Sequence, residues 1–258
     1  MKKYILLLLA CLVGGSSIFA QNQHFTTSGT IEFEKKVNMY ALIQKRIKDD
    51  NGGFASKAFE QYKKTQPQFK ILKATLTFTN NKTYYAPVPV AETIGNGWFS
   101  NEPSAALNNT VYTDLNTNMS VSNKKVFEEQ FLVKDTARRI TWKITDETRE
   151  IAGYTCRRAN ALVMDSIYVV AFYTDEIPLS GGPESFTGLP GMILGVALPH
   201  ENATWFATKV TDMTIPESQL KIPTKGKQVN YPSLVTTLKT ALKSWGEYAQ
   251  SYFKVFLL

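Results

Sequence analysis

Alternation of apolar and polar residues with a period of two runs through most of this chain, and it constrains the fold more than any other feature. Residues 72–79 (LKATLTFT) are the clearest case, because leucine, alanine, leucine and phenylalanine alternate with lysine and threonine. This alternation is typical of a strand with one buried and one exposed face. The Asn-Asn pair that follows it predicts a tight turn into a second strand.

Further strand-like segments follow at short intervals with no helical pattern between them. We expect them at residues 31–34, 83–85, 111–115, 119–126, 130–134, 139–145, 154–161, 166–174, 192–198 and 204–211. This spacing favours an antiparallel meander. Many strands with one polar face favour a curved sheet over a flat one. We therefore predict a mainly β fold with a minor α+β character, built as a single curved antiparallel sheet or an open, bowl-like half barrel.

Helical patterns are confined to two parts of the chain. Residues 39–48 and 55–64 predict a helical insertion after the first strand. Residues 232–252 begin with a proline and carry apolar residues at steps of three and four, which predicts one C-terminal amphipathic helix. We expect it to pack back on the sheet, although a membrane-binding or partner-binding helix fits the same pattern.

The first 20 residues have the layout of a secretory signal peptide. Lys2 and Lys3 precede an apolar run, and small residues lead to an expected cleavage after Ala20. A second interpretation is a lipobox ending at Cys11, which would give a lipid-anchored N-terminus. No other long apolar stretch follows, so we expect no integral membrane protein after cleavage. The predicted organisation is a signal peptide (1–20), an antiparallel β domain (21–222), and a linker with a C-terminal helix on the same domain (223–258).

Charge and cysteine content argue against several classes of protein. The 29 Lys and Arg against 22 Asp and Glu give a net charge of +7, but the cations are scattered and form no arginine-rich block. We therefore expect no nucleic-acid partner. Beyond Cys11 the chain has a single cysteine, Cys156, which we expect to be a small buried residue on a strand. A catalytic thiol would need a nearby histidine, and only His24 and His200 exist.

No standard catalytic or metal-binding signature is present in the sequence. A zincin helix motif, a phosphate-binding glycine loop and a cysteine–histidine zinc spacing are all absent. We therefore predict no catalytic residue, no metal and no cofactor. The alternative is a hydrolase that uses two of the carboxylates of Asp146, Glu147 and Asp175 across a cleft.

A curved sheet with an apolar and aromatic inner face would hold a ligand. The candidate lining residues, chosen by alternation alone, are Leu72, Phe78, Trp142, Ile144, Tyr154 and Phe172. The same alternation is also compatible with a packed core at some of these positions.

Residues 186–194 (FTGLPGMIL) form the most distinctive stretch of the chain. Proline followed by glycine predicts a type II turn, which is either a structural corner or the rim of a binding cavity. The stretch resembles the motif that names the GLPGLI family, with a methionine where that family usually has leucine. The matching motif residues are Gly188, Leu189, Pro190, Gly191, Met192 and Ile193. The blocks at 142–144, 147–159 and 171–178 are similar to the family in the same order, with Phe172 in place of an expected tryptophan.

This resemblance implies a protein that Gram-negative bacteria secrete across the inner membrane, to the periplasm or the outer membrane. The family has a bowl-like domain and no established activity or catalytic residue, and its genes often lie near TonB-dependent receptors. The expected function is a non-catalytic binding or accessory module linked to outer-membrane transport. Its expected partners are such a receptor and an apolar or peptide ligand. The alternatives are an envelope hydrolase and a structural docking protein.

Overall fold

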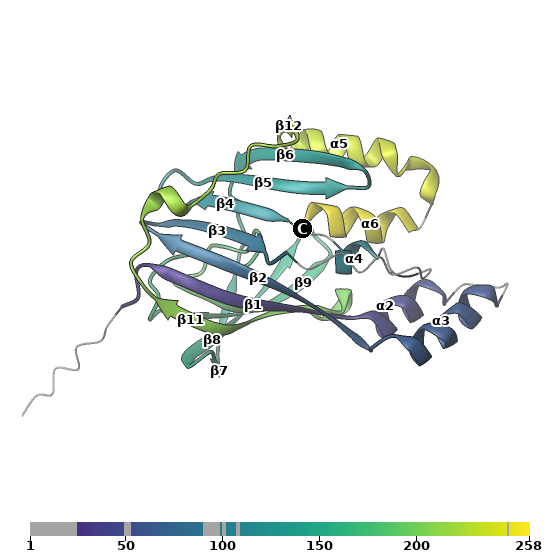
Figure 1. Cartoon of the computed structure of the whole chain (residues 1–258), viewed down its shortest axis with the longest axis horizontal. Helices are drawn as coiled ribbons and strands as arrows, with labels where there is room; N and C mark the ends of the chain where they lie inside the picture. Colours follow the sequence, from purple (N-terminus) through teal and green to yellow (C-terminus); the bar gives the residue numbers. More distant parts are fainter. Residues whose placement is uncertain (1–24, 49–52, 90–98, 100–101, 107–108, 247) are drawn as a thin grey trace, which may run out of the picture.

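The structure is a computed structural model, and it describes residues 25–48, 53–89, 99, 102–106, 109–246 and 248–258. The proposed leader with Cys11, and His24, lie outside these residues. Twelve strands form one open sheet in the order β12-β6-β5-β4-β3-β2-β1-β11-β10-β9-β8-β7 (Figure 1). The strands are β1 (Gly29–Asn38), β2 (Phe69–Thr79), β3 (Lys82–Pro87), β4 (Thr110–Asp114), β5 (Met119–Val126), β6 (Glu129–Thr136), β7 (Lys143–Ile151), β8 (Tyr154–Val163), β9 (Ile167–Thr174), β10 (Met192–Leu198), β11 (Ala203–Asp212) and β12 (Lys227–Val229).

The sheet consists of two antiparallel meanders joined at β1. Strands β1 to β6 form one meander and β7 to β11 the other, and β1 pairs with both β2 and β11. The short β12 lies parallel to β6 and is the exception to the antiparallel arrangement. The mainly β prediction with an open, curved antiparallel sheet is therefore confirmed.

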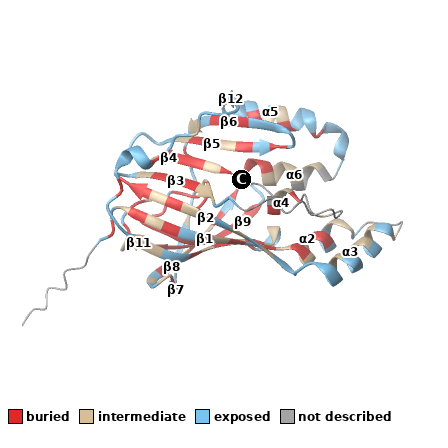
Figure 2. Cartoon of the chain, viewed as in Figure 1, coloured by how far each residue is buried: buried red, intermediate tan, exposed pale blue. Residues whose placement is uncertain are grey.

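Alternation along each strand places one face of the sheet inside the molecule. In β1, Ile31, Phe33, Lys35 and Val37 are buried while the residues that alternate with them are more exposed, with a similar pattern in β2 (Figure 2). The largest core cluster joins residues from both meanders, for example Phe78 of β2 and Val169 of β9. The sheet therefore curls so that its two halves share one core.

The helices lie toward one end of the sheet (Figure 1). They are α2 (Met39–Arg46), α3 (Phe54–Thr65), α4 (Pro103–Ala106), α5 (Tyr231–Ala241) and α6 (Tyr248–Leu257). Helices α2 and α3 form the expected insertion after the first strand. Helices α5 and α6 bury Leu234, Leu238, Phe256 and Leu257 against Phe131 and Val133 of β6. Apolar burial of this kind holds the C-terminal segment on the inner face of the sheet.

Two local expectations were wrong. Residues 139–142 are not part of a strand, because β7 begins at Lys143 and the preceding segment carries the chain from β6 to the opposite edge of the sheet. The single C-terminal helix is interrupted after Ala241 by the 3-10 turn η3 (Lys243–Trp245), and Gly246, which follows this turn, has a φ of 57°. A positive φ ends a right-handed helix, and glycine adopts it at little cost.

The turns contain the backbone conformations that their residues favour. Asn80 and Asn81 both have positive φ, as a two-residue type I′ hairpin requires. Gly191 has a φ of 151°, and its N–H donates to the Leu189 carbonyl at 2.8 Å. A tight turn around Pro190 is therefore present, but its hydrogen bond spans three residues and not the four of the expected type II turn.

Substitution of Gly191 by alanine should destabilise the protein by about 3 kcal/mol or more, because a Cβ there would overlap the carbonyl oxygen of Thr174 in a strained backbone conformation. Urea denaturation measures the loss. Gly153→Ala is the matched control, since Gly153 has a φ of 85° and open space around it, so only about 1 kcal/mol of strain is expected. Equal losses in the two variants would contradict the steric argument.

Candidate functional site

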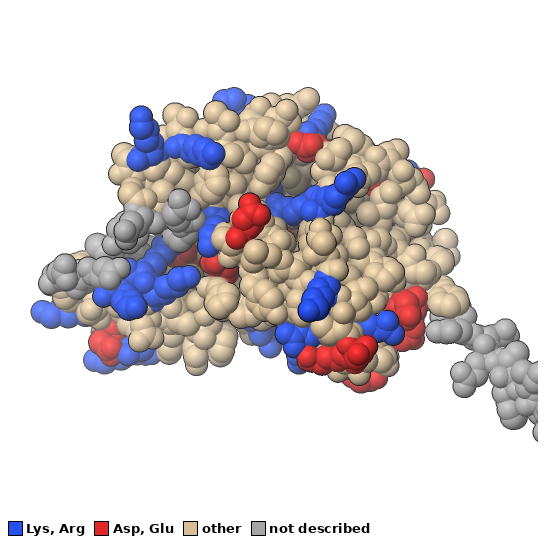
Figure 3. All heavy atoms as spheres, turned by 180° about the vertical axis from the view of Figure 1, so that it is seen from behind, with Lys and Arg blue, Asp and Glu red and all other residues tan. Residues whose placement is uncertain are grey.

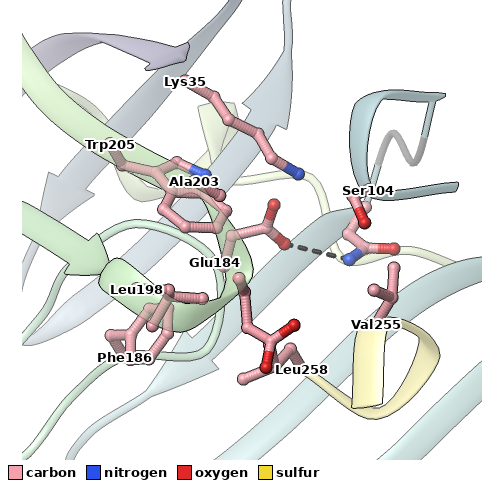
Figure 4. Close-up of a pocket in the computed structure, with 11 residues that line it drawn as sticks. Lys35, Ser104, Glu184, Phe186, Leu198, Ala203, Trp205, Val255 and Leu258 are labelled. Carbon is pink, nitrogen blue, oxygen red and sulfur yellow. Dashed lines mark hydrogen bonds between the residues drawn. The ribbon is translucent and has the colours of Figure 1, made fainter. Parts of the chain in front are cut away.

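A cavity of ≈ 30 Å³ lies on the inner face of the sheet where the two meanders meet (Figure 4). Its walls come from β1, the end of β10, β11, the loop between β9 and β10, η1 (Pro199–Glu201), α4, the residue before β4 and the end of the chain at α6. The lining residues are Lys35, Ser104, Asn109, Glu184, Phe186, Leu198, Glu201, Ala203, Trp205, Val255 and Leu258. Segments from both halves of the chain therefore build one enclosure with a mixed polar and apolar lining.

Lys35 occupies an inward position of β1 that the alternation would assign to an apolar residue. It follows Ile31 and Phe33 on the same face and is only 8% exposed. In the sheet register it lies between Leu72 of β2 and Trp205 of β11. Its ammonium nitrogen lies 4.8 Å from the centre of the Trp205 ring, and the side chain extends toward the cavity (Figure 4). The ring face attracts the cation but offers no oxygen or nitrogen acceptor to its N–H groups.

Glu184 is the carboxylate whose negative charge acts on Lys35. It lies in the loop between β9 and β10, is 8% exposed, and has a φ of 52°. Its carboxylate accepts a hydrogen bond of 3.0 Å from the Asn109 side-chain amide (Figure 4). A positive φ strains the backbone of a non-glycine residue. At Glu184 this strained conformation coincides with the burial of a charged side chain in the cavity wall.

A second, smaller cavity of ≈ 10 Å³ adjoins the same polar residues. It shares Lys35, Asn109 and Glu184 with the larger one and is otherwise lined by Leu72, Lys73, Ala74, Tyr85 and Pro87. The three shared side chains therefore form a polar centre with empty space on both sides. Burial raises the pKa of Tyr85 well above its usual value, and the negative charge of Glu184 adds to that rise.

Two further cations, Lys124 and Arg138, lie near this centre. Lys124 projects from the inner face of β5 and is 6% exposed. Burial lowers its pKa to about 8, an effect that Glu184 opposes and that Arg138 and Lys35 reinforce. Burial likewise lowers the pKa of Lys35, and Glu184 again opposes it. Both lysines therefore interact with Glu184 through space, and within the described residues neither forms an ion pair.

Arg138 lies in the crossover between β6 and β7 and connects the charged centre to the C-terminal helices. It donates a hydrogen bond to the Leu257 carbonyl and stacks on the Tyr231 ring at 5.7 Å. Its second terminal nitrogen is buried without a partner in the described structure. Within the described residues, the Asn109 Oδ1 is likewise buried without a partner, and the buried Trp205 Nε1 has no well-aligned hydrogen bond, although it acts on the Tyr85 hydroxyl and slightly opposes the rise of the Tyr85 pKa.

Polar contacts hold α6 over the cavity. Ser185 donates to the Leu258 carbonyl at 2.9 Å, and Arg46 donates to the Tyr252 hydroxyl at 2.9 Å. Arg46 also forms a buried ion pair with Glu102 at 2.6 Å, next to the short helix α4. This carboxylate is therefore already neutralised, which leaves Glu184 as the acid that acts on Lys35 and Lys124.

The buried charges determine which kind of group the cavity can bind. A buried ammonium group without a close counter-ion costs several kcal/mol relative to water, and unpartnered buried donors add to this cost. A cavity beside such groups is suited to accept an anionic or strongly polar atom group. The same cavity has apolar walls, among them Phe186, Leu198 and Val255.

The six predicted lining residues lie in different surroundings. Leu72 lines the smaller cavity, and Phe78 is fully buried in the core. Trp142 donates its indole N–H to the Thr187 carbonyl at 2.9 Å. Tyr154 packs at the border of the core, Phe172 is buried near Phe206, and Ile144 is 43% exposed. A role for them in ligand binding stays a prediction.

The carboxylates considered for a hydrolase lie elsewhere. Asp146, Glu147 and Asp175 are exposed, the first two on the edge strand β7. None of the three lines either of the cavities described above. Within the described residues, no group of three or more His, Cys, Asp or Glu is placed to hold a metal ion.

Sequence reasoning missed the polar residues at the centre of the site. The alternation in β1 carries a signal for Lys35, because a lysine in phase with Ile31 and Phe33 must face the core. Lys124 carries the same signal more weakly, since serine precedes it on that face. Glu184 and Asn109 lie in loops, which have no apolar–polar periodicity. No sequence pattern therefore predicts that their side chains lie in the cavity wall.

On the face in Figure 3, basic and acidic side chains are interspersed and separated by uncharged surface.

Among the described residues, no helix has the length and apolar character needed to span a membrane.

A family model described as "Protein of unknown function (Porph_ging)" matches residues 162–195, from the end of β8 to the middle of β10. No curated protein sequence matches. A solved structure of PNGF-II (C2 crystal form) aligns with a TM-score of 0.50 and 13% identity, over 80% of this chain and 31% of that one.

Two other solved structures align less well. The P21 form of PNGF-II gives a TM-score of 0.49 at 14% identity, over 81% of this chain and 32% of that one. An uncharacterised conserved protein from Thermus thermophilus gives 0.38 at 6% identity, over 81% of this chain and 93% of that one. This chain therefore spans about a third of the PNGF-II chains that it matches, and the likeness concerns the fold alone.

Replacement of Lys124 by methionine should flatten the pH dependence of stability. The pKa of Lys124 is about 8 in the folded protein, below the 10.5 of an unfolded chain. The wild type should therefore gain up to about 3 kcal/mol as pH rises from 8 to 10.5, because the buried charge is lost. Urea denaturation at pH 7 and pH 9.5 measures this gain. Lys125→Met, on the exposed face of the same strand, should keep the wild-type slope, and an unchanged slope in Lys124→Met would contradict the assignment.

Cys156 should be unreactive in the folded protein. The side chain is fully buried on β8, and burial raises the pKa of its thiol to about 12. Because the thiolate is the reactive form, labelling with a thiol reagent at pH 8 should be slow in buffer and fast in 6 M guanidinium. A Cys156→Ser variant that carries Thr155→Cys, an exposed neighbour, provides the reactive control. Equally fast labelling of native Cys156 would show that the strand opens.

Proposed function

We propose that this chain is a non-catalytic binding module of the Gram-negative cell envelope, with its binding site in the cavity on the inner face of the sheet. The observation that carries the proposal is the enclosure itself. It combines empty space, buried charges without close partners and apolar walls in one place. Sites with a few polar groups in an apolar lining are typical of small-molecule binding.

Membership of the GLPGLI family is part of this proposal. The family model of unknown function covers the Gly188–Ile193 motif, and the other similar blocks extend the resemblance to residues 142–198. Gly188, Leu189, Pro190 and Gly191 shape the end of the loop that carries Glu184 and Phe186 into the cavity wall. On this view the motif supports a binding loop as well as a structural corner.

The resemblance also supports a cellular setting. We infer export across the inner membrane by the proposed leader, and residence in the periplasm or at the outer membrane. An accessory role beside a TonB-dependent receptor follows from the same resemblance. The proposed cargo is a peptide-like or partly apolar small molecule, because the cavity walls are mixed.

The two alternatives have less support. The carboxylates proposed for a hydrolase are exposed and lie outside the cavities. A docking role for the C-terminal helix has to use its outer surface, since Leu234, Leu238 and Phe256 are buried in the fold.

Native mass spectrometry of the protein purified gently from its own envelope tests the binding function. We expect a reproducible added mass that denaturation removes. Ala203→Leu should abolish the adduct, because Ala203 lines the cavity and the larger side chain fills it. Ala207→Leu is the matched control, since Ala207 is a similarly buried residue of the same strand but does not line the cavity.

Two outcomes would contradict this proposal. One is a bare protein mass in every preparation. The other is an adduct that survives in Ala203→Leu while that variant keeps the native circular dichroism spectrum, because the ligand would then lie elsewhere.

A further inference from the structure

The buried charges in and around the cavity are not balanced: Lys35 and Glu184 line it, and Lys124 and Arg138 act on it from outside its lining. Lys35 and Lys124 carry two positive charges, and the carboxylate that acts on both is Glu184 alone. Of the other acids nearby, Glu102 is paired with Arg46 at 2.6 Å and Glu201 lies 3.8 Å from Lys254. Arg138 adds a third buried cation beside Lys124. Among the described side chains, these three cations therefore outnumber the one acid that acts on the two lysines.

Buried charge of this kind is expensive, and the surrounding residues do not relieve it. Lys35 and Lys124 are more than nine-tenths buried, with no ion pair within the described residues. Most proteins place apolar side chains at such inward strand positions, and methionine would fill the same volume without the cost. A bound monoanion would remove the excess charge and supply hydrogen-bond acceptors to the ammonium groups.

The buried polar atoms without well-aligned hydrogen bonds indicate which donors and acceptors the ligand carries. Among the described residues, Arg138 Nη1 is a donor without an acceptor and Asn109 Oδ1 an acceptor without a donor, and Trp205 Nε1 has only a poorly aligned contact with the Tyr85 hydroxyl. Asn109 and Trp205 both line the larger cavity together with Lys35 (Figure 4). A group with negatively charged oxygens and a neighbouring N–H or O–H would satisfy both kinds of atom.

The size of the cavity limits what enters it. A volume of ≈ 30 Å³ holds about two water molecules, which matches a carboxylate and not a whole drug-sized ligand. Apolar residues such as Phe186, Leu198 and Val255 adjoin the polar centre and suit a small aliphatic part next to the acid.

We propose that the cavity between Lys35, Glu184 and Trp205 binds the carboxylate of a ligand that carries an N–H or O–H donor next to it, such as the C-terminus of a peptide. This inference rests on the proposed binding function and names its ligand class. Lys35 and Lys124 supply the charge, Trp205 donates a hydrogen bond to the ligand, and Asn109 accepts one from it.

Isothermal titration calorimetry of the full mature chain with N-acetylglycine tests this proposal. N-acetylglycine has a carboxylate and an adjacent N–H, and N-acetylglycinamide is its neutral counterpart. We expect binding of the acid with an affinity at least about tenfold higher than that of the amide. Butyrate, which lacks the N–H, should bind more weakly than N-acetylglycine. Inorganic phosphate at the same ionic strength should bind more weakly as well.

The variants test the location of the site. Lys35→Met and Lys124→Met should each weaken N-acetylglycine binding by about tenfold or more, while both keep the native fold. Lys36→Met and Lys125→Met are the matched controls, because these lysines are exposed neighbours on the same strands. Both controls should bind like the wild type. A thermal melt of each variant without ligand checks that a lost affinity is not a lost fold.

Several results would overturn the proposal. They are equal binding of acid and amide, stronger binding of phosphate than of N-acetylglycine, and undiminished binding in Lys35→Met and Lys124→Met. The envelope-derived adduct separates this failure from that of the binding function. An adduct present in the wild type and in Lys35→Met, but absent in Ala203→Leu, would preserve the binding function and reject the carboxylate.

Discussion

The pairing of β1 with both β2 and β11 is the interaction on which the rest of the structure depends. Residues of β1 are matched with β2 on one side and with β11 on the other over almost the full strand. This strand joins two meanders into one sheet, and the shared core forms because the sheet curls around its inner face. The position of each inward residue of β1 therefore decides what lies at the centre of the molecule.

One of those inward residues is charged, and this has consequences throughout the interior. Lys35 faces Trp205, Glu184 and Asn109, and with Lys124 it creates a buried positive region beside empty space. Such a region lowers stability unless something neutralises it. Natural proteins retain such costs at sites of function, which is why the cavity and the charges are best interpreted together.

Much of the fold was predictable from local pattern. Alternation located the strands, and the Asn80-Asn81 pair located a hairpin, because both signals depend on neighbours in the chain. The prediction failed at residues 139–142, which connect opposite edges of the sheet, and at the break before α6. In both places apolar residues have the spacing of a strand or a helix. Contacts with distant parts of the chain nevertheless hold the backbone in an irregular conformation. Trp142, for instance, donates its indole N–H to a carbonyl in another loop.

By itself the sequence determined the class of fold, the strand positions and the resemblance carried by the residues 186–194, since periodicity and motifs are properties of adjacent residues. Only the tertiary structure decided which residues line the cavity. The lining residues Lys35, Asn109 and Glu184 come from β1 and from two separate loops, and Lys124, which acts on them through space, comes from β5. Their proximity arises from strand order and sheet curvature, and neither of these is encoded in the spacing of the residues along the chain.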